Sequence, residues 1–296
     1  MKELFLILVL LCVESTRAEY CAINQLPLEK YEQEYDTKYP KIPVKKNLPS
    51  PPLFKQGECG VSKNDQSKQI VNGKDAPVNA WPWQIWFRSS LGICGGSIIH
   101  REWIITASHC GRDQVNDVYY GSNSRQRANR TKTKTRFRPP GRGNDMALYK
   151  LSSPLTFSDS VQPICFPEGN VWDASPCFVT GWGDTSFSGS ATPDILQQLR
   201  IRIINHDMCQ AGHSFKDESY NVGRYFCVDN VESANGKYAA SYIGDSGGPV
   251  SCLKNGRYYL VGTVAHSIKM DEKAMKFYVS VPSNAQWIAD TINKNS

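Results

Sequence analysis

The chain has 296 residues, of which 40% are hydrophobic, and a formal net charge of +6. This length and hydrophobic content suit a globular core, in one large domain or two small ones. Beyond the first residues no stretch reaches the ~18 apolar residues that a transmembrane helix needs, so we expect no such helix.

The N-terminus carries the pattern of a secretory signal peptide over residues 1–18. A short apolar run, Leu4–Cys12, follows Lys2, and the small residue Ala18 marks a plausible cleavage site. The alternative is a buried N-terminal strand. The signal-peptide interpretation predicts a product that is extracellular or stored in a secretory granule, where disulfides are permitted.

Residues 19–69 differ in composition from the rest of the chain. They are rich in Lys, Glu and Pro and show no sustained period of 3.6 or 2. Such a segment cannot bury enough apolar surface to order itself alone. We interpret it as a propeptide or linker, and the alternative is an independent binding module.

From residue 70 onward, short strand-like runs recur between clusters of Gly, Pro, Asn and Asp. Examples are Gln84–Phe87, Ser97–Ile99, Trp103–Ile105, Cys177–Thr180 and Tyr258–Val264. This pattern predicts an all-β barrel or sandwich. One helix is expected at the end of the chain, over Asn284–Ile292, because apolar residues recur there after Pro282–Ser283.

One glycine-rich stretch, Gly244–Pro249, has the composition of a nucleophile turn. Its glycines allow a tight backbone turn that presents Ser246, and the neighbouring N–H groups can hold an oxyanion. An ordinary surface turn is the alternative, since a serine nucleophile needs a base and a group that orients the base. His109, just after an apolar strand, and Asp145, at the start of another hydrophobic run, supply both.

Six motifs follow one another along the chain. They are Ile70–Gly73, Cys94–Ser97, Thr106–Cys110, Asn144–Leu148, Gly181–Gly183 and Gly244–Pro249. With these motifs, residues 70–296 resemble the trypsin/chymotrypsin-like serine proteases. The resemblance implies a protease domain over 70–296, built as two six-stranded antiparallel β-barrels with the active site between them and a C-terminal helix.

The resemblance also assigns roles to residues. Ser246 would be the nucleophile, His109 the general base and Asp145 the residue that holds the imidazole, with the N–H groups of Gly244 and Ser246 as the oxyanion hole. We therefore expect a secreted serine endopeptidase, made as a zymogen, that acts on protein or peptide substrates without a cofactor. The alternative is a catalytically impaired homologue that serves as a binding or adhesion module.

Activation in this family requires a new N-terminal isoleucine, here Ile70, to pair with the aspartate before the serine, here Asp245. The residue before Ile70 is Gln69 rather than Lys or Arg. Three interpretations stay open: an activator that cuts after Gln69, trimming that follows a cut after Lys68, or a chain that remains a zymogen.

The specificity pocket implied by the resemblance is lined by Ala240, Ser267 and Lys276. No aspartate stands at Ala240, so cleavage after Arg or Lys is not expected. The pocket disulfide of many members is missing, as in granzymes and chymase, and Tyr242 stands where one of its cysteines would be. Lys276 replaces a usual glycine, which suggests a pocket that accepts Asp or Glu. Two alternatives stay equally open: the Lys276 side chain fills the pocket, or it turns outward.

A further departure lies beside that pocket. Ala265 stands where the family has a serine that contacts the catalytic aspartate, and His266 stands where it has an aromatic residue. Backbone pairing with a substrate would survive both changes, because it needs only N–H and C=O groups.

Ten cysteines are present, and removal of the signal peptide takes Cys12 with it. The resemblance implies four disulfides: Cys94–Cys110, Cys177–Cys252, Cys209–Cys227 and Cys59–Cys165. Cys21 is left over, as a free thiol or as a bond to another chain, so a monomer is expected unless Cys21 pairs between molecules. The sequence contains neither an HExxH motif nor a pair of CxxC motifs, so we expect no metal site.

A basic stretch, residues 124–142, lies between His109 and Asp145. Its eight cationic residues are Arg125, Arg127, Arg130, Lys132, Lys134, Arg136, Arg138 and Arg142. Such a cluster suits a polyanion such as a heparin-like glycan, whereas nucleic acid does not fit a secreted chain. A merely solvated strand or loop, or a processing site, is the alternative. Asn129 heads the only complete N-glycosylation sequon.

Overall fold

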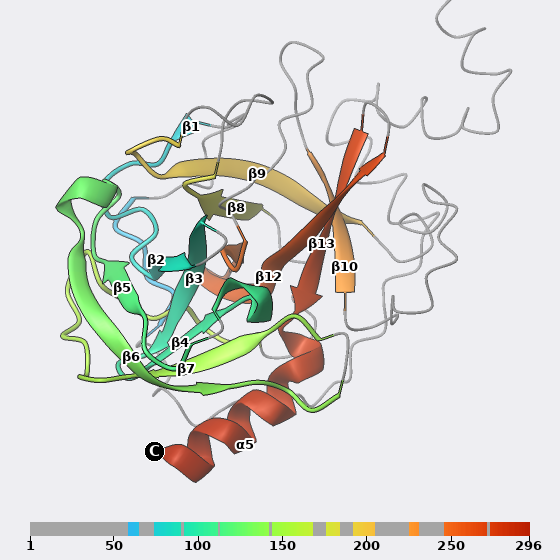
Figure 1. Ribbon diagram of the computed structural model, residues 1–296. Helices are drawn as coiled ribbons and strands as arrows, with labels where there is room; N and C mark the ends of the chain where they lie inside the picture. Colours follow the sequence, from blue (N-terminus) through green and yellow to red (C-terminus); the bar gives the residue numbers. More distant parts are fainter. Residues whose placement is uncertain are drawn as a thin grey trace, which may run out of the picture. The chain divides into compact units, whose positions relative to one another are not determined.

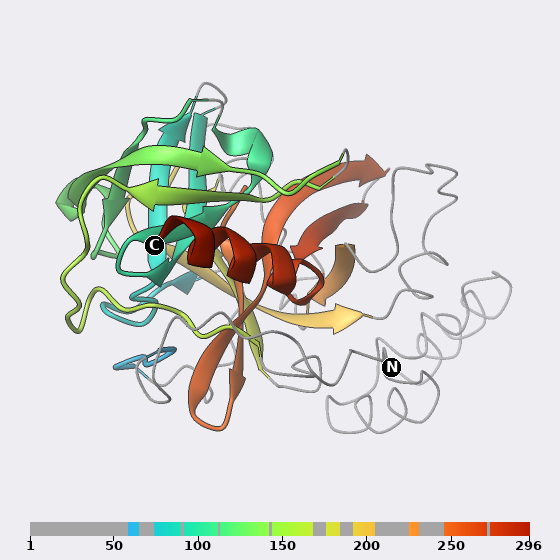
Figure 2. The ribbon, with the colours of Figure 1, turned by 90° about the horizontal axis from the view of Figure 1, so that it is seen from below.

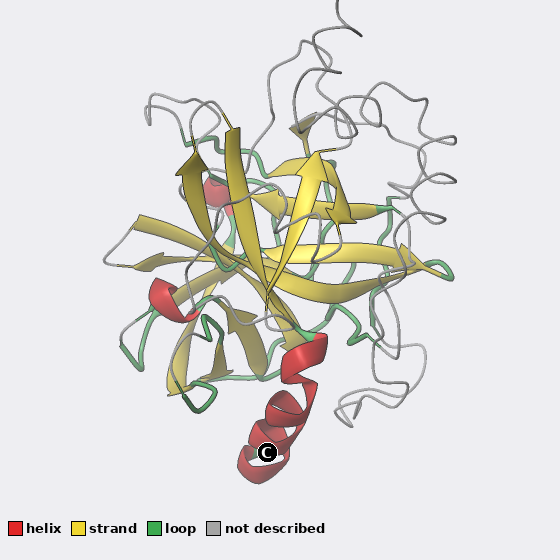
Figure 3. Ribbon diagram, turned by 90° about the vertical axis from the view of Figure 1, so that its right-hand side faces the viewer, coloured by secondary structure: helices red, strands yellow, loops and turns green. Residues whose placement is uncertain are grey.

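The computed structural model describes residues 59–64, 74–89, 92–111, 113–141, 144–167, 176–183, 192–204, 225–230, 246–270 and 273–296. All of these residues lie within the unit Pro43–Ser296. Strands make up most of this part of the chain, and a helix lies at the C-terminal end (Figure 3).

The first barrel is built from the first half of the domain (cyan to green in Figure 1). Its strands are β2 (Gln84–Ser89), β3 (Gly92–His100), β4 (Trp103–Thr106), β5 (Asp117–Tyr120), β6 (Asn129–Phe137) and β7 (Ala147–Leu151). They close in the order β2-β3-β4-β7-β6-β5, and every neighbouring pair is antiparallel.

The strands of this barrel differ in how deeply their side chains are buried. All four residues of β4 are buried, which fits the unbroken apolar run that predicted it. In β6, by contrast, Thr133 is buried between the exposed Lys132 and Lys134. Because side chains alternate between the two faces of a strand, β6 keeps a polar outer face.

The second barrel uses β8 (Cys177–Gly181) and strands from the second half of the chain. These are β9 (Gln197–Ile204), β10 (Tyr225–Asn230), β11 (Pro249–Lys254), β12 (Arg257–Met270) and β13 (Lys273–Ser280), with the short β1 (Lys74–Asp75) paired to β9. The sheet order β9-β10-β13-β12-β11-β8 returns to β9 through the β8–β9 pairing. Thus the all-β prediction, with two six-stranded antiparallel barrels, is confirmed.

The core of this second barrel is a cluster of buried side chains centred on a disulfide. Cys177 and Cys252 pair with each other on adjacent strands, β8 and β11, among Val179, Val250 and Val261. This disulfide joins residues 75 apart in sequence. It therefore fastens two strands whose contact is long-range.

The C-terminal helix α5 spans Ala285–Asn295, after a 3-10 turn over Pro282–Asn284. It begins one residue later than expected and ends three residues later than Ile292. Its last turn is extended by side-chain bonds, in which Asn295 Nδ2 donates to Thr291 O and Ser296 Oγ donates to Ile292 O. Figure 3 shows the C-terminal helix α5 extending away from the strands, and Figure 2 shows it from below.

Residues 59–64 are fastened to the second barrel, although they belong to the stretch that was expected not to order alone. Cys59 is bonded to Cys165, and Arg257 donates to the Cys59 carbonyl at 2.7 Å. Gly60 donates to Pro163 O at 2.8 Å and accepts from the Tyr258 N–H at 2.9 Å. The order of this segment thus comes from contacts with the domain.

Within the described residues, no helix has the length and hydropathy to span a membrane.

Candidate active site

His109 lies in a 3-10 turn, η1 (Ser108–Cys110), directly after the end of buried strand β4. The turn has one internal backbone hydrogen bond, from Cys110 N–H to Ala107 O, and no side-chain cap. A disulfide from Cys110 to Cys94 on β3 fastens it to the barrel wall. The strand and the disulfide together fix the backbone position of His109.

Asp145 reaches the imidazole because strand β4 ends beside the residue at which its neighbour β7 begins. The β4–β7 pairing sets Thr106 opposite Ala147, so the residues just after β4 and just before β7 meet. Asp145 Oδ2 lies 2.7 Å from His109 Nδ1, and Asp145 Oδ1 accepts the backbone N–H of His109 at 2.9 Å. Both carboxylate oxygens are therefore committed to one residue, which fixes the ring orientation.

This geometry leaves the other ring nitrogen available. With Nδ1 donating to the carboxylate, the Nε2 of His109 carries the lone pair that can take a proton. The His109 side chain is 34% exposed and that of Asp145 is 17% exposed. A substrate can thus reach the imidazole while the carboxylate stays largely shielded.

Ser246 stands in a turn that leads into β11 and is held by the first barrel. The Gly95 N–H donates to the Ser246 carbonyl at 2.8 Å, and the next residue, Gly247, donates to Val264 O at 2.7 Å. Gly247 has φ 80°, a conformation that favours glycine. The glycines of two distant motifs, 94–97 and 244–249, are therefore parts of one contact.

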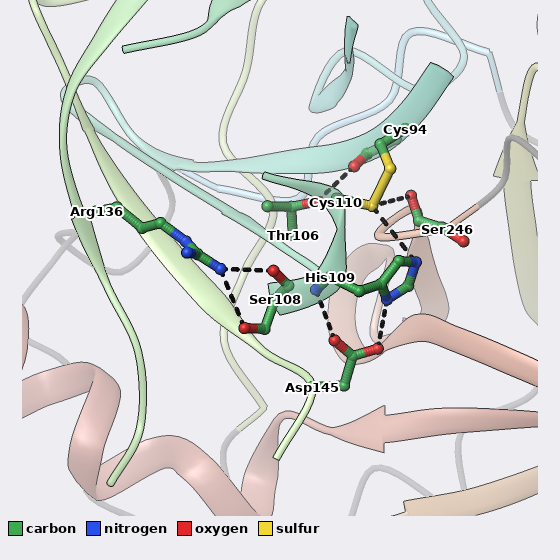
Figure 4. The surroundings of a disulfide bond; sticks show 9 residues. Cys94, Thr106, Ser108, His109, Cys110, Arg136, Asp145 and Ser246 are labelled. Carbon is green, nitrogen blue, oxygen red and sulfur yellow. Dashed lines mark hydrogen bonds and ion pairs between the residues drawn. A yellow bond between two sulfur atoms is a disulfide. The ribbon is translucent and has the colours of Figure 1, made fainter. Parts of the chain in front are cut away.

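Ser246 and the ring of His109 both lie next to the sulfur atom of Cys110 (Figure 4). Cys110 Sγ is 3.8 Å from His109 Nε2 and 3.4 Å from the Ser246 carbonyl oxygen. This sulfur and that of Cys94 form a disulfide, so neither is a thiolate that could hold a metal beside the imidazole. An imidazole whose Nδ1 is held by a carboxylate can act as a base toward a nearby hydroxyl.

Asn144 and Asn284 were not recognised from the sequence as support for this site. The Asn144 amide donates to Asn284 Oδ1 at 2.6 Å, and the buried Asn284 donates onward to Ser280 O at 2.8 Å. The residue before Asp145 is thereby tied to the start of α5. The pattern of a local motif could not have revealed a partner 140 residues away.

Two of the residues predicted to line the specificity pocket lie on adjacent strands. Ser267 on β12 pairs with Lys276 on β13, and His266 pairs with Phe277. The register shifts between Val264 and His266, and the intervening Ala265 is completely buried. The predictions for Ile70, Ala240, Gly244 and Asp245 fall outside the described residues.

Three of the four implied disulfides are present: Cys59–Cys165, Cys94–Cys110 and Cys177–Cys252. For the fourth, Cys227 lies on β10, whereas Cys209 is outside the described residues. Cys21, expected to be left over, is also outside them.

The basic stretch forms a 3-10 turn over Arg125–Arg127 and strand β6. Five of its cationic side chains are exposed: Arg127, Arg130, Lys132, Lys134 and Arg138. Arg125 instead donates to the carbonyls of Pro193 and Thr192, at 2.9 and 3.1 Å. Asn129 is exposed at the first position of β6.

Comparison with known proteins agrees with this architecture. A family model described as Trypsin matches residues 70–288. Trypsin from Sus scrofa is 31% identical over 240 residues, an alignment that covers 78% of this chain and 99% of that protein. The family match spans both barrels and the residues around His109, Asp145 and Ser246.

Proposed function

Because this chain belongs to the trypsin family of serine peptidases, we propose that it is a secreted serine endopeptidase, made as a zymogen, with Ser246, His109 and Asp145 as its triad. The observation that carries the proposal is the pair of bonds from Asp145 to His109, at 2.7 and 2.9 Å. An aspartate that accepts from both the ring and the backbone of one histidine suits a base that must keep its tautomer through a reaction cycle.

In the proposed mechanism, His109 Nε2 removes the proton of Ser246 Oγ as this oxygen attacks the scissile carbonyl carbon. The tetrahedral oxyanion accepts hydrogen bonds from the N–H groups of Ser246 and Gly244, an interaction typically worth about 3–4 kcal/mol per donor. His109 then gives its proton to the leaving amine, and a water repeats the sequence on the acyl-enzyme. Asp145 stabilises the imidazolium throughout.

Activation would depend on the pairing of a released Ile70 with Asp245. The Cys59–Cys165 disulfide joins the preceding segment to the second barrel. A cut before Ile70 therefore need not separate the two pieces. In this proposal residues 19–69 are the propeptide, and residues 1–18 the signal peptide that directs secretion.

The pocket is proposed to accept an acidic residue before the scissile bond. The backbones of Ser267 and Lys276 pair across β12 and β13, so two of the residues proposed to line the pocket are neighbours in the ladder, which supports the proposal. Ala240 offers no competing carboxylate. A lysine ammonium would favour a carboxylate by a charge-assisted hydrogen bond, worth about 1.5–3 kcal/mol or about 10–100-fold in rate.

The proposal is tested with protein that carries an enteropeptidase site ending immediately before Ile70. After cleavage, digestion of an unstructured protein substrate is compared between this chain and its Ser246→Ala variant, and we expect only the former to cut. Peptides that differ only in Asp, Leu or Arg before the scissile bond then test the pocket, with Lys276→Gly as the matched variant. Efficient cleavage after Arg would rule out the acidic preference.

A binding or adhesion module is the second candidate, and Ala265 favours it. This residue is completely buried and offers a methyl group where the family has a serine hydroxyl. Under this alternative the released chain would fold and bind a partner, yet digest no protein.

The exposed cations of the basic stretch are proposed to bind a sulfated, heparin-like glycan. Arg130, Lys132 and Lys134 recur on the outer face of β6 at about 7 Å intervals, as alternate residues of a strand do. Lys132 has an acidic neighbour in the half-buried Asp117, at 4.0 Å, and a contact of this length from an exposed ammonium holds it only weakly. An extended chain of repeated sulfates matches this linear arrangement of charge.

Elution from immobilised heparin tests this partner. We expect the double variant Lys132→Gln, Lys134→Gln to elute at lower salt, and Arg125→Gln to elute near the parent, because Arg125 already donates to two carbonyls. Equal elution of the double variant and the parent would contradict the proposal. Asn129 lies beside these cations, and we propose it as the glycosylated asparagine.

A further inference from the structure

The turn that carries His109 is fastened from outside at each of its three residues. Cys110 is bonded to Cys94, and His109 is held by Asp145. The third anchor is Arg136, whose guanidinium donates from Nη2 to the Ser108 carbonyl at 2.5 Å and to Ser108 Oγ at 3.1 Å (Figure 4). A short 3-10 turn with a single internal bond depends on such outside contacts for its position.

We propose that Arg136 is a positioning residue for His109, which holds the Ser108 end of the turn so that the imidazole stays aligned between Asp145 and Ser246. In its kinetic part this inference rests on the proposed protease function. Its structural part does not, because it concerns the placement of the imidazole in the folded chain.

A β-bulge explains why this cation turns away from the surface. Thr133 pairs with Leu151 and Thr135 with Lys150, so the register of β6 shifts between them and Arg136 comes to lie opposite Tyr149. An uninterrupted alternation would have placed Arg136 on the outer face with Lys132 and Lys134. One extra residue in a strand exchanges the two faces beyond it.

The inward position of Arg136 is supported along its length. Its backbone N–H donates to Gln114 Oε1 at 2.7 Å, and its guanidinium carbon lies 5.9 Å from the centroid of the Tyr149 ring. The same ring contacts the other end of the turn, because a Cβ on Gly111 would lie 2.2 Å from Tyr149 Oη. Arg136 and Tyr149 therefore form one support beneath the residues that flank His109.

A cation is well suited to this support. Hydrogen bonds from a charged donor to a carbonyl are stronger than neutral ones, and the rigid, planar guanidinium holds the one nitrogen, Nη2, that donates to both oxygens of Ser108. A lysine could still donate to the Ser108 carbonyl, although not with the same planar geometry. A glutamine is shorter and would not reach with comparable strength.

Steady-state kinetics on the released chain provide the first test. In Arg136→Gln we expect kcat to fall about 10–100-fold with KM for a small peptide substrate within about twofold, since small misplacements of a catalytic group lower turnover steeply. Arg136→Lys should recover part of the loss. Arg125→Gln is the matched control, because it removes another arginine of the stretch that donates to carbonyls, those of residues 192 and 193.

The second test needs no activity. The proton on His109 Nδ1, in its 2.7 Å contact with Asp145, should give a downfield proton NMR resonance in the parent chain. We expect this resonance to shift or broaden in Arg136→Gln and to persist in Arg125→Gln. An unchanged resonance together with an unchanged kcat in folded Arg136→Gln would overturn the inference. If the parent chain shows no turnover at all, the proposed function fails, while the NMR comparison still decides the role of Arg136.

Discussion

At Gly247 the backbone has a φ of 80°, and a Cβ added there would lie 2.1 Å from Thr106 Oγ1 and 2.5 Å from the Gly95 carbonyl oxygen. These two atoms share a hydrogen bond, in which Thr106 Oγ1 donates to Gly95 O at 2.7 Å. A side chain at Gly247 would therefore force the turn of Ser246 away from the strand that leads to His109. The spacing of serine and imidazole is thus set partly by the absence of one carbon atom.

Gly247→Ala should lower the free energy of unfolding by about 3 kcal/mol, because it combines backbone strain with a clash in a packed interior. Gly256→Ala is the matched control: its φ is 74°, yet a Cβ added to it would have no atom within 4 Å. It should cost only about 1 kcal/mol. Urea denaturation of both variants checks the difference, and equal losses would contradict this account of Gly247.

A second residue-scale prediction concerns His100, at the end of β3. Burial lowers the pKa of this imidazole below its usual 6.5, against an opposing effect of Glu102, while Arg101 and Lys150 lower it further. The backbone N–H of Glu102 donates to His100 Nδ1 at 3.3 Å, which requires an unprotonated nitrogen. The folded state therefore resists the proton that the unfolded state accepts.

Because the unfolded chain binds this proton first, stability should fall as pH drops below about 6.5. In urea denaturation we therefore expect a lower midpoint concentration at pH 5.5 than at pH 7.5. In His100→Gln the decrease should be smaller, because the titrating group is gone. If the two proteins lose the same stability over this interval, His100 does not contribute to it.

At the scale of elements, the segment 59–64 behaves as an added part of the second barrel. Besides the Cys59 disulfide, Ser62 Oγ donates to Ala80 O at 2.8 Å, and Lys63 pairs with Asp159 at 3.2 Å. Gly60 has φ 66° and no room for a Cβ, which would lie 2.4 Å from Tyr258 O. These contacts hold the segment against the folded domain, on the N-terminal side of Ile70 in the sequence.

Removal of both cysteines, in Cys59→Ala with Cys165→Ala, should lower the free energy of unfolding by about 2–5 kcal/mol, because the bond closes a loop of 106 residues. In the parent chain, a cut before Ile70 should yield one band on a non-reducing gel and two after reduction. The double variant should give two bands under both conditions. A parent chain that separates without reductant would contradict the tether.

At the scale of the whole molecule, the two barrels supply different parts of one site. His109 follows the end of β4 and Asp145 precedes the start of β7, whereas Ser246 precedes β11. Hydrogen bonds between the barrels hold these parts in position. Trp83 Nε1 donates to Ser251 Oγ at 3.2 Å, and Thr180 Oγ1 donates to Gln84 Oε1 at 2.6 Å. The site is therefore a product of barrel packing as much as of local sequence.

What the sequence could predict follows from the range of each interaction. The apolar run of β4 and the glycines around Ser246 act over a few residues, so their patterns could be read directly. Arg136 and Ser108 are 28 residues apart, and their contact depends on a bulge in β6 that no composition signal marks. The single-sign cluster therefore predicted an exposed surface, although two of its members, Arg125 and Arg136, are half-buried and donate to backbone carbonyls of other segments.

The most direct test of the central claim is to locate a covalent label. Protein cut immediately before Ile70 would be treated with a fluorophosphonate probe, and the labelled peptide identified by mass spectrometry. We predict that Ser246 alone is labelled and that His109→Ala lowers labelling by at least about a thousandfold, because the hydroxyl then lacks its base. An unlabelled Ser246, in a folded chain with a verified Ile70 terminus, would contradict the protease account and favour the binding module.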